Sequence, residues 1–259
     1  MANLRTNNLS GEQGQNAYRG SVFFAGNDTG TALRAVESDS NLTFGTGDFT
    51  IEFWVLRNNT ERAVYLDWRN AGGAQGNRVT LYSTATTTGK LYFYSNGTNH
   101  INTTDPLNTN SWHHVALTRA SSSTKLFVNG VQVGSTYSDS NDYVGPQSSD
   151  GIYIGRFSGG TYDTKGYISN LRIVKGTALY TSDFTPPQSE LTVVDGTVLL
   201  CCQDSDDATK DAVGTTITTE GNLNNTDLTK QQPKVIPPYG VDAGNVFGGP
   251  IQQSSQGYM

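Results

Sequence analysis

The chain is poor in charged residues, histidine and cysteine. Charged residues make up 15% of its 259 residues, there are 3 histidines and 2 cysteines, and 23 Asp and Glu outnumber 17 scattered Lys and Arg. The formal net charge is -6 and the pI is near 5.0. Binding to nucleic acid requires a basic patch or stripe. We therefore expect no nucleic-acid partner.

Long apolar runs are also missing. None approaches the roughly 20 residues of a membrane-spanning helix, and the first residues, MANLRTNNLSGEQGQ, contain no hydrophobic signal core. Cys201 and Cys202 are adjacent, and neighbours in a strand point to opposite faces, so they provide no disulfide framework. We expect no membrane partner and synthesis in a reducing cytosol.

Small polar residues dominate instead. Thr, Ser and Asn together make up roughly 30% of the chain, and Gly contributes 29 residues. Thr, Tyr, Phe and Val favour strands, while Gly and Asn favour turns. An aromatic content of 10% argues against disorder throughout. The composition predicts an all-β protein.

The pattern divides the chain into three zones. Residues 1–20 form a polar N-terminal arm, residues 21–202 alternate strand and turn signals, and residues 203–259 form an extended C-terminal tail. The tail has too few large apolar residues to bury a core of its own. We expect it to become ordered against another chain and to anchor an assembly.

The strand signals of the middle zone are short and closely spaced. In DFTIEFWVL (48–56), alternate residues from Phe49 to Val55 share one face, and Asn129-Gly130 is a strong hairpin signal. The other signals are SVFFAG (21–26), RVTLYS (78–83), KLYFYS (90–95), HHVALTR (113–119), TKLFVNGVQVGS (124–135), GIYIGRF (151–157), GYISNLRIV (166–174) and TVLLCC (197–202). They predict two antiparallel sheets packed as a jelly-roll sandwich.

Four segments resemble the laminin-G-like branch of the concanavalin A-like lectin/glucanase superfamily. They are GTGDFTIEFWV (45–55), WHHVALTR (112–119), KLFVNGVQVGS (125–135) and GYISNLRIVKGTALYTSDFTPP (166–187). The last segment, followed by TVLLCCQ, resembles versions in structural proteins of bacteriophages of marine bacteria and cyanobacteria. The resemblance implies a jelly roll whose first strand, SVFFAG, lies near the last, TVLLCC, with arm and tail on one side.

The sequence disfavours catalysis. Members of this superfamily that hydrolyse glucans carry acidic residues at alternate positions of one strand, whereas here Glu52 stands alone with Asp48 near it. His113 and His114 show no metal-ligand spacing, and as strand neighbours we expect one in the core and one exposed. No GxSxG motif supports a serine nucleophile. We therefore predict a protein that is not an enzyme.

Calcium is the one cofactor that the resemblance suggests. Laminin-G-like domains often hold a Ca²⁺ ion at the rim with Asp side chains and carbonyl oxygens. Of the loop acids, Asp142 and Asp163 lie in loops rich in Tyr and Gly and are the favoured ligands; the alternative is that they fix turns. The other loop acids are Asp28, Asp67, Asp139 and Asp150.

Aromatic residues in loops suggest a sugar platform. Trp68, next to Arg69, leads into a Gly-rich loop, and Tyr143 and Tyr162 occupy similar loops. These four residues are the candidate carbohydrate site. The alternative is that their side chains only pack within turns. Trp54 and Trp112 lie in strongly apolar strands and are assigned to the core.

Two functions remain open. The first is a non-enzymatic virion structural protein, a capsid decoration or fibre component made in the host cytoplasm, that contacts other virion proteins and copies of itself. The second is a lectin-like protein that recognises a host-surface glycan. For the first, the predicted assembly contacts of the tail are Ile236, Pro237, Pro238, Tyr239, Val246 and Phe247.

Overall fold

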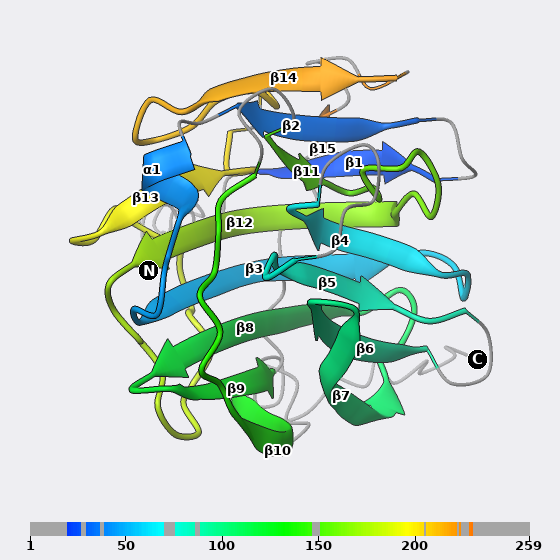
Figure 1. Cartoon of the computed structure of the whole chain (residues 1–259). Helices are drawn as coiled ribbons and strands as arrows, with labels where there is room; N and C mark the ends of the chain where they lie inside the picture. Colours follow the sequence, from blue (N-terminus) through cyan, green and yellow to red (C-terminus); the bar gives the residue numbers. More distant parts are fainter. Residues whose placement is uncertain are drawn as a thin grey trace, which may run out of the picture.

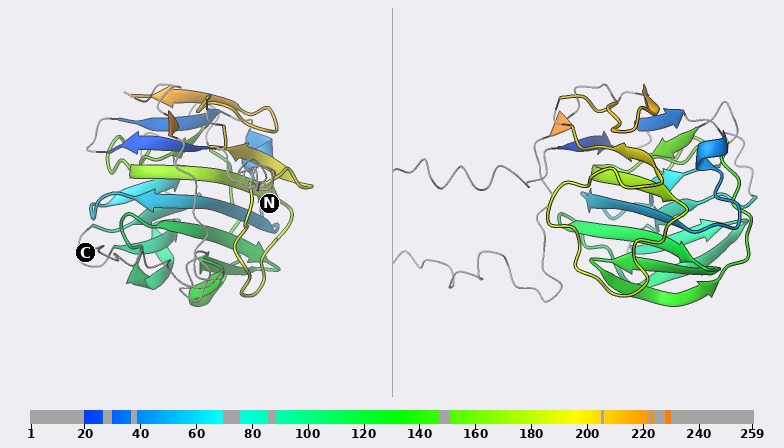
Figure 2. Two further views of the ribbon diagram at one scale, coloured as in Figure 1. Left: turned by 180° about the vertical axis from the view of Figure 1, so that it is seen from behind. Right: turned by 90° about the vertical axis from the view of Figure 1, so that its left-hand side faces the viewer.

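Two antiparallel β-sheets packed face to face form the body of the protein (Figure 1). The computed structural model describes residues 20–26, 30–36, 39–69, 76–85, 89–146, 151–204, 206–221, 223 and 228–229. Seen from the side, the sheets are the two layers of a sandwich (Figure 2). The predicted all-β jelly roll is confirmed.

The first sheet lies at the back in Figure 1 and has the order β10-β9-β8-β3-β12-β1-β15, with β13 also paired to β12. Its strands are β1 (Ser21–Ala25), β3 (Phe49–Arg57), β8 (Trp112–Ala120), β9 (Ser123–Val128), β10 (Val131–Ser138), β12 (Lys165–Lys175), β13 (Thr197–Cys201) and β15 (Leu228–Thr229).

The second sheet lies in front and has the order β14-β2-β11-β4-β5-β6-β7. Its strands are β2 (Ala32–Val36), β4 (Ala63–Asp67), β5 (Thr80–Ser83), β6 (Lys90–Ser95), β7 (Thr98–Pro106), β11 (Ile152–Ile154) and β14 (Thr216–Glu220). A short helix, α1 (Asp39–Leu42), follows β2. No helix in the described part of the chain is long and apolar enough to cross a membrane.

The core between the sheets follows the period-two pattern of the strands. Phe49, Ile51, Phe53 and Val55 of β3 all point into it, as the alternation predicts. In β9 and β10, the Asn129-Gly130 turn forms the expected hairpin, with both residues at positive φ. A side chain at Gly130 would overlap the carbonyl oxygen of Phe184, so this glycine is required for space as well as for backbone conformation.

The sheets extend beyond the boundary that the sequence placed at residue 202. Strand β14 pairs along the whole of β2, and β15 pairs with Ser21 and Val22 of β1. The segment 216–220, TITTE, completes an edge of the second sheet and contributes Ile217 to the core. Strands β1 and β13 lie one after the other along the same side of β12, so the predicted proximity of SVFFAG and TVLLCC is confirmed.

The outer face of the first sheet is covered by the segment between β12 and β13. The rings of Tyr180 and Phe184 stack with their centroids 3.7 Å apart, and Phe184 meets the ring of His114 at 5.7 Å. His114 is fully buried as a result, and His113, on the opposite face of β8, is 8% exposed. The expectation that one of the two histidines is exposed was wrong, because a loop distant in sequence shields the outer one.

Candidate functional site

Tyrosine rings line the outer face of the second sheet. In β5 and β6, Leu81 and Phe93 point into the core, so their strand neighbours Tyr82, Tyr92 and Tyr94 point outward. Tyr82 and Tyr92 are paired across the two strands, and their rings stack with centroids 5.2 Å apart. The ring of Tyr94 meets that of Tyr82 edge-on at 6.5 Å.

Arg62 enters this face just before β4. Its guanidinium carbon lies 4.8 Å from the centre of the Tyr82 ring and 4.2 Å from that of Tyr162. Tyr162 belongs to the loop between β11 and β12, has a positive φ of 60°, and is 40% exposed. A cation over two ring faces is held by the ring quadrupoles.

Arg69, just after β4, makes a second contact of the same kind. Its guanidinium carbon lies 5.2 Å from the centre of the Tyr94 ring and 4.5 Å from that of Phe157. Phe157 in turn meets Tyr162, with ring centroids 6.3 Å apart. The contacts close into one continuous cluster, which we call the aromatic–arginine surface: Arg62, Arg69, Tyr82, Tyr92, Tyr94, Phe157 and Tyr162.

A buried carboxylate positions Arg69. Asp67 is the last residue of β4, and its side chain is fully buried. Its Oδ1 accepts hydrogen bonds from Arg69 Nε at 2.7 Å and Thr80 Oγ1 at 2.8 Å, and its Oδ2 accepts one from the backbone N–H of Ser158 at 2.9 Å. Asp67 therefore joins β4, β5 and the loop that carries Phe157, and it neutralises Arg69.

Arg62 has no such counter-charge among the residues that the structure describes. None of the ion pairs among the described residues includes Arg62, and its Nε is buried without a hydrogen-bond acceptor among those residues. Burial raises the pKa of Tyr82, although the hydrogen bond to Asn99 and the nearby Arg62 act in the opposite direction. The Tyr82 hydroxyl therefore stays protonated at neutral pH and donates to Asn99 Oδ1 at 2.9 Å.

Sequence comparison identifies the family. A laminin G model, described as the concanavalin A-like lectin/glucanases superfamily, matches residues 24–180, more than half of the chain. The chain belongs to the concanavalin A-like lectin/glucanase superfamily. No curated protein sequence matches it.

Solved structures share the fold at low sequence identity. A candidate carbohydrate-binding protein from Bacteroides ovatus is 22% identical with a TM-score of 0.63; the match covers 85% of this chain and 62% of that one. The native heptameric SAP-like pentraxin from Limulus polyphemus is 11% identical with a TM-score of 0.52, over 84% of this chain and 97% of that one. The present chain thus spans less than two thirds of the Bacteroides protein.

Two of the four predicted carbohydrate-site residues lie on the aromatic–arginine surface. These are Arg69 and Tyr162, which Phe157 connects. Arg62, Tyr82, Tyr92, Tyr94 and Phe157 were missed. The alternation in RVTLYS and KLYFYS places the strand tyrosines on the face opposite the core, and this signal could have found them.

Trp68 and Tyr143 were wrongly predicted to contact a ligand. Trp68 is fully buried, and its ring packs edge-on against Phe44 at 4.8 Å. Strand β4 has an irregularity between Val64 and Leu66, after which Leu66 and Trp68 both point into the core. Tyr143 is also fully buried, and its hydroxyl donates to Asp139 Oδ2 at 2.9 Å.

The two favoured calcium ligands lie at opposite ends of the sandwich. Asp142 is exposed and adjoins Tyr143, whose ring meets Phe49 at the start of β3. Asp163 is buried near the end of β3, where its Oδ2 accepts from the backbone N–H of Gly30 at 2.7 Å. A nine-residue strand is about 30 Å long, so the two cannot ligate one ion. No group of three or more His, Cys, Asp or Glu in the described residues could hold a metal.

Glu52 is part of a buried network on the first sheet. Its carboxylate accepts hydrogen bonds from Arg172 Nε at 2.9 Å and Tyr180 Oη at 2.8 Å, and lies 3.2 Å from His114 Nε2. Burial alone would raise the pKa of Glu52, but His114 and Arg172 together lower it. Both oxygens are occupied by protein groups. Glu52 is therefore a buried, hydrogen-bonded strand residue.

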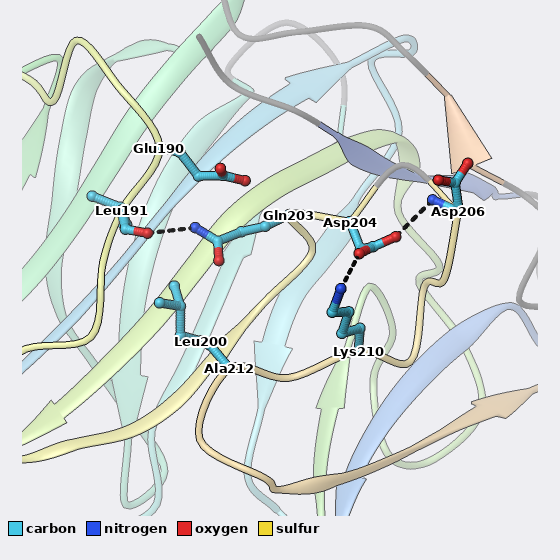
Figure 3. A pocket seen from close by; sticks show the side chains of 8 residues that line it. All are labelled: Glu190, Leu191, Leu200, Gln203, Asp204, Asp206, Lys210 and Ala212. Carbon is cyan, nitrogen blue, oxygen red and sulfur yellow. Dashed lines mark hydrogen bonds and ion pairs between the residues drawn. The ribbon is translucent and has the colours of Figure 1, made fainter. Parts of the chain in front are cut away.

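A hollow of about 350 Å³ lies beside β13 (Figure 3). Asp204 Oδ2 forms an ion pair there with Lys210 Nζ at 2.6 Å, and the hydrogen bond from Lys210 lowers the Asp204 pKa. The lining residues carry no aromatic ring on which a sugar could stack: Glu190, Leu191, Leu200, Gln203, Asp204, Asp206, Lys210 and Ala212. The predicted assembly contacts between residues 236 and 247 lie outside the described residues.

Proposed function

We propose that this chain is a carbohydrate-binding, lectin-like protein and that its ligand lies on the aromatic–arginine surface. The observation that carries the proposal is the exposed ring of Tyr162, held by Arg62 beside the tyrosines of β5 and β6. The flat apolar face of a sugar ring stacks on an aromatic ring. Arginine N–H groups and tyrosine hydroxyls beside it donate hydrogen bonds to sugar oxygens.

The surface is prepared for a ligand before binding. Contacts to the rings orient both guanidinium groups, and Asp67 fixes Arg69. Less side-chain freedom is therefore lost when a ligand binds, which increases affinity. The Bacteroides ovatus structure with the same fold, described as a candidate carbohydrate-binding protein, agrees with this proposal.

The proposal is tested with a glycan array and substitutions of Tyr162. We expect the wild-type chain to bind at least one glycan. Tyr162→Ala should weaken this binding about tenfold, because it removes a stacking ring and a cation–π partner of Arg62. Tyr162→Phe keeps the ring and should bind like the wild type.

Val131→Ala, which changes an exposed residue of the first sheet, is the control for nonspecific loss of binding. Absence of glycan binding by the wild type, or equal binding by Tyr162→Ala, would reject the proposal.

A virion structural role is the second proposal, and it is compatible with glycan binding. It is supported by the resemblance of residues 166–187 and TVLLCCQ to bacteriophage structural proteins, and by the polar, proline-containing tail. We favour carbohydrate binding because the residues proposed for it are among those that the structure describes. The proposed anchor at residues 236–247 lies outside the described residues. Deletion of residues 232–259 should abolish incorporation into particles; unchanged incorporation would reject a tail-based anchor.

A further inference from the structure

We propose that the aromatic–arginine surface selects acidic sugars, and that Arg62 binds the acid group. This inference rests on the proposed function, since it names the class of glycan that the same surface takes. The ligand is a pyranose that bears a carboxylate or a sulfate. Both groups present a pair of anionic oxygens that a guanidinium binds through two parallel N–H bonds.

Two arginines in similar surroundings differ in whether a carboxylate of the described residues neutralises them. Each guanidinium lies over two aromatic rings: Arg69 over Tyr94 and Phe157, Arg62 over Tyr82 and Tyr162. Asp67 balances the charge of Arg69 through a 2.7 Å ion pair. Among the described residues, no carboxylate forms an ion pair with Arg62. The surface thus carries one positive charge that no described residue neutralises.

The N–H groups of Arg62 are not fully hydrogen-bonded by the described residues. Aromatic rings attract the face of a guanidinium, but its N–H groups point outward in its own plane and still need acceptors. Arg62 Nε is buried and has no acceptor among the described residues. A buried donor without a partner is costly, and an anionic oxygen at the terminal N–H groups of the same guanidinium offsets that cost. A neutral hydroxyl does so less effectively, because it carries no charge.

The charge of the whole chain also affects how an acidic ligand binds. With a formal net charge of -6, the protein as a whole repels acidic glycans at long range. Attraction must therefore come from short-range contacts, and Arg62 supplies a charged one beside the ring of Tyr162 on which a sugar can stack. Binding then depends on where the acid group lies on the sugar, and not on total ligand charge.

The experiment is calorimetric titration of the full chain with matched ligands. Trigalacturonate is compared with its fully methyl-esterified form, which keeps the sugar rings and removes the charge. A sulfated galactose disaccharide and its unsulfated counterpart form the second arm and distinguish sulfate from carboxylate. We expect at least one acidic ligand to bind about tenfold or more tightly than its neutral partner, because hydrogen bonds to charged groups are the stronger ones.

Substitution of Arg62 links that preference to one side chain. Arg62→Gln should bring acidic and neutral ligands to the same affinity, and Arg62→Lys should recover part of the preference, since it restores charge without the planar fork. Lys125→Gln removes the same charge from the first sheet and is the matched control. It should keep the preference, with thermal melts showing that every variant is folded.

The outcomes separate the two proposals. Equal affinity for acidic and neutral ligands in the wild type, or an acid preference that survives Arg62→Gln, overturns the inference about acidic sugars. The proposal of carbohydrate binding would still stand in either case, because the chain would still bind a glycan. Loss of all glycan binding on the array overturns both.

Discussion

At the scale of single residues, short polar side chains organise the candidate site and the opposite sheet. Asp67 ties two strands and a loop to Arg69, while Glu52 gathers Arg172, His114 and Tyr180 on the first sheet. Both carboxylates are fully buried, and every oxygen has a protein partner. Removing the charge of either residue should therefore have its own effect on stability and on glycan binding.

Asp67→Asn should weaken both the fold and glycan binding. The amide loses the ion pair to Arg69. Its NH₂ group also faces the N–H and O–H donors from which the carboxylate accepted hydrogen bonds. We expect the free energy of unfolding, measured in urea, to fall by about 1–3 kcal/mol, with a parallel loss of glycan affinity. Asp105→Asn, at an exposed position of β7, is the control. Unchanged stability and affinity in Asp67→Asn would contradict the positioning role of Asp67.

Glu52→Gln should lower stability and leave glycan binding intact. Breaking a buried ion pair leaves Arg172 without its counter-charge, and such changes typically cost about 3–5 kcal/mol. The network lies on the first sheet, away from the aromatic–arginine surface. Denaturant unfolding of this variant is compared with Glu61→Gln, which changes an exposed acid. A loss of glycan affinity at unchanged stability would instead place Glu52 at the binding site.

At the scale of elements, the second sheet depends on a strand from far along the chain. Strand β14 covers one side of β2, from Val36 to Ala32, and buries Ile217. Its sequence, TITTE, has β character, but its polar surroundings indicated a tail rather than a strand of the sandwich. Only the pairing with β2 decides that it belongs to the folded domain.

Truncation distinguishes these two interpretations of the C-terminal part. A chain that ends after Gln203 loses β14 and β15, exposing the edges of β2 and β1, and should melt at a lower temperature or aggregate. A chain that ends after Thr229 keeps all described strands and should melt like the full chain. The measurement is thermal unfolding followed by circular dichroism. Equal melting of the two truncated chains would contradict a structural role for β14.

At the scale of the whole molecule, buried histidines make stability depend on pH. Burial lowers the pKa of His113, with Arg57 acting in the same direction and the hydrogen bond to Asn108 opposing it. Burial likewise lowers the pKa of His100. As the pH falls, these side chains take up a proton near pH 6.5 in the unfolded chain and only at a lower pH in the folded chain. Stability is therefore fully present above that pH and is lost as the pH falls.

The unfolding midpoint in urea should accordingly be lower at pH 5.5 than at pH 7.5. His113 contributes at most about 1.4 kcal/mol per pH unit to the change of the free energy of unfolding with pH. His113→Gln should reduce the slope between these pH values. Below about pH 4.5, protonation of Glu52, whose pKa is lowered in the folded state, should add a further loss that Glu52→Gln lacks. A midpoint independent of pH in the wild type would contradict the burial argument.

The sequence by itself determined the sandwich, the main strands and which face of each strand forms the core. Alternation of apolar residues and the Asn129-Gly130 turn are local properties, and backbone geometry converts them directly into strand faces and a hairpin. The tertiary structure alone decided which side chains meet. Arg62, Tyr82 and Phe157 come from separate segments, the irregularity in β4 turned Trp68 inward, and the segment after β12 covered His114. Burial and contact depend on what packs from elsewhere in the chain, and no local pattern contains that information.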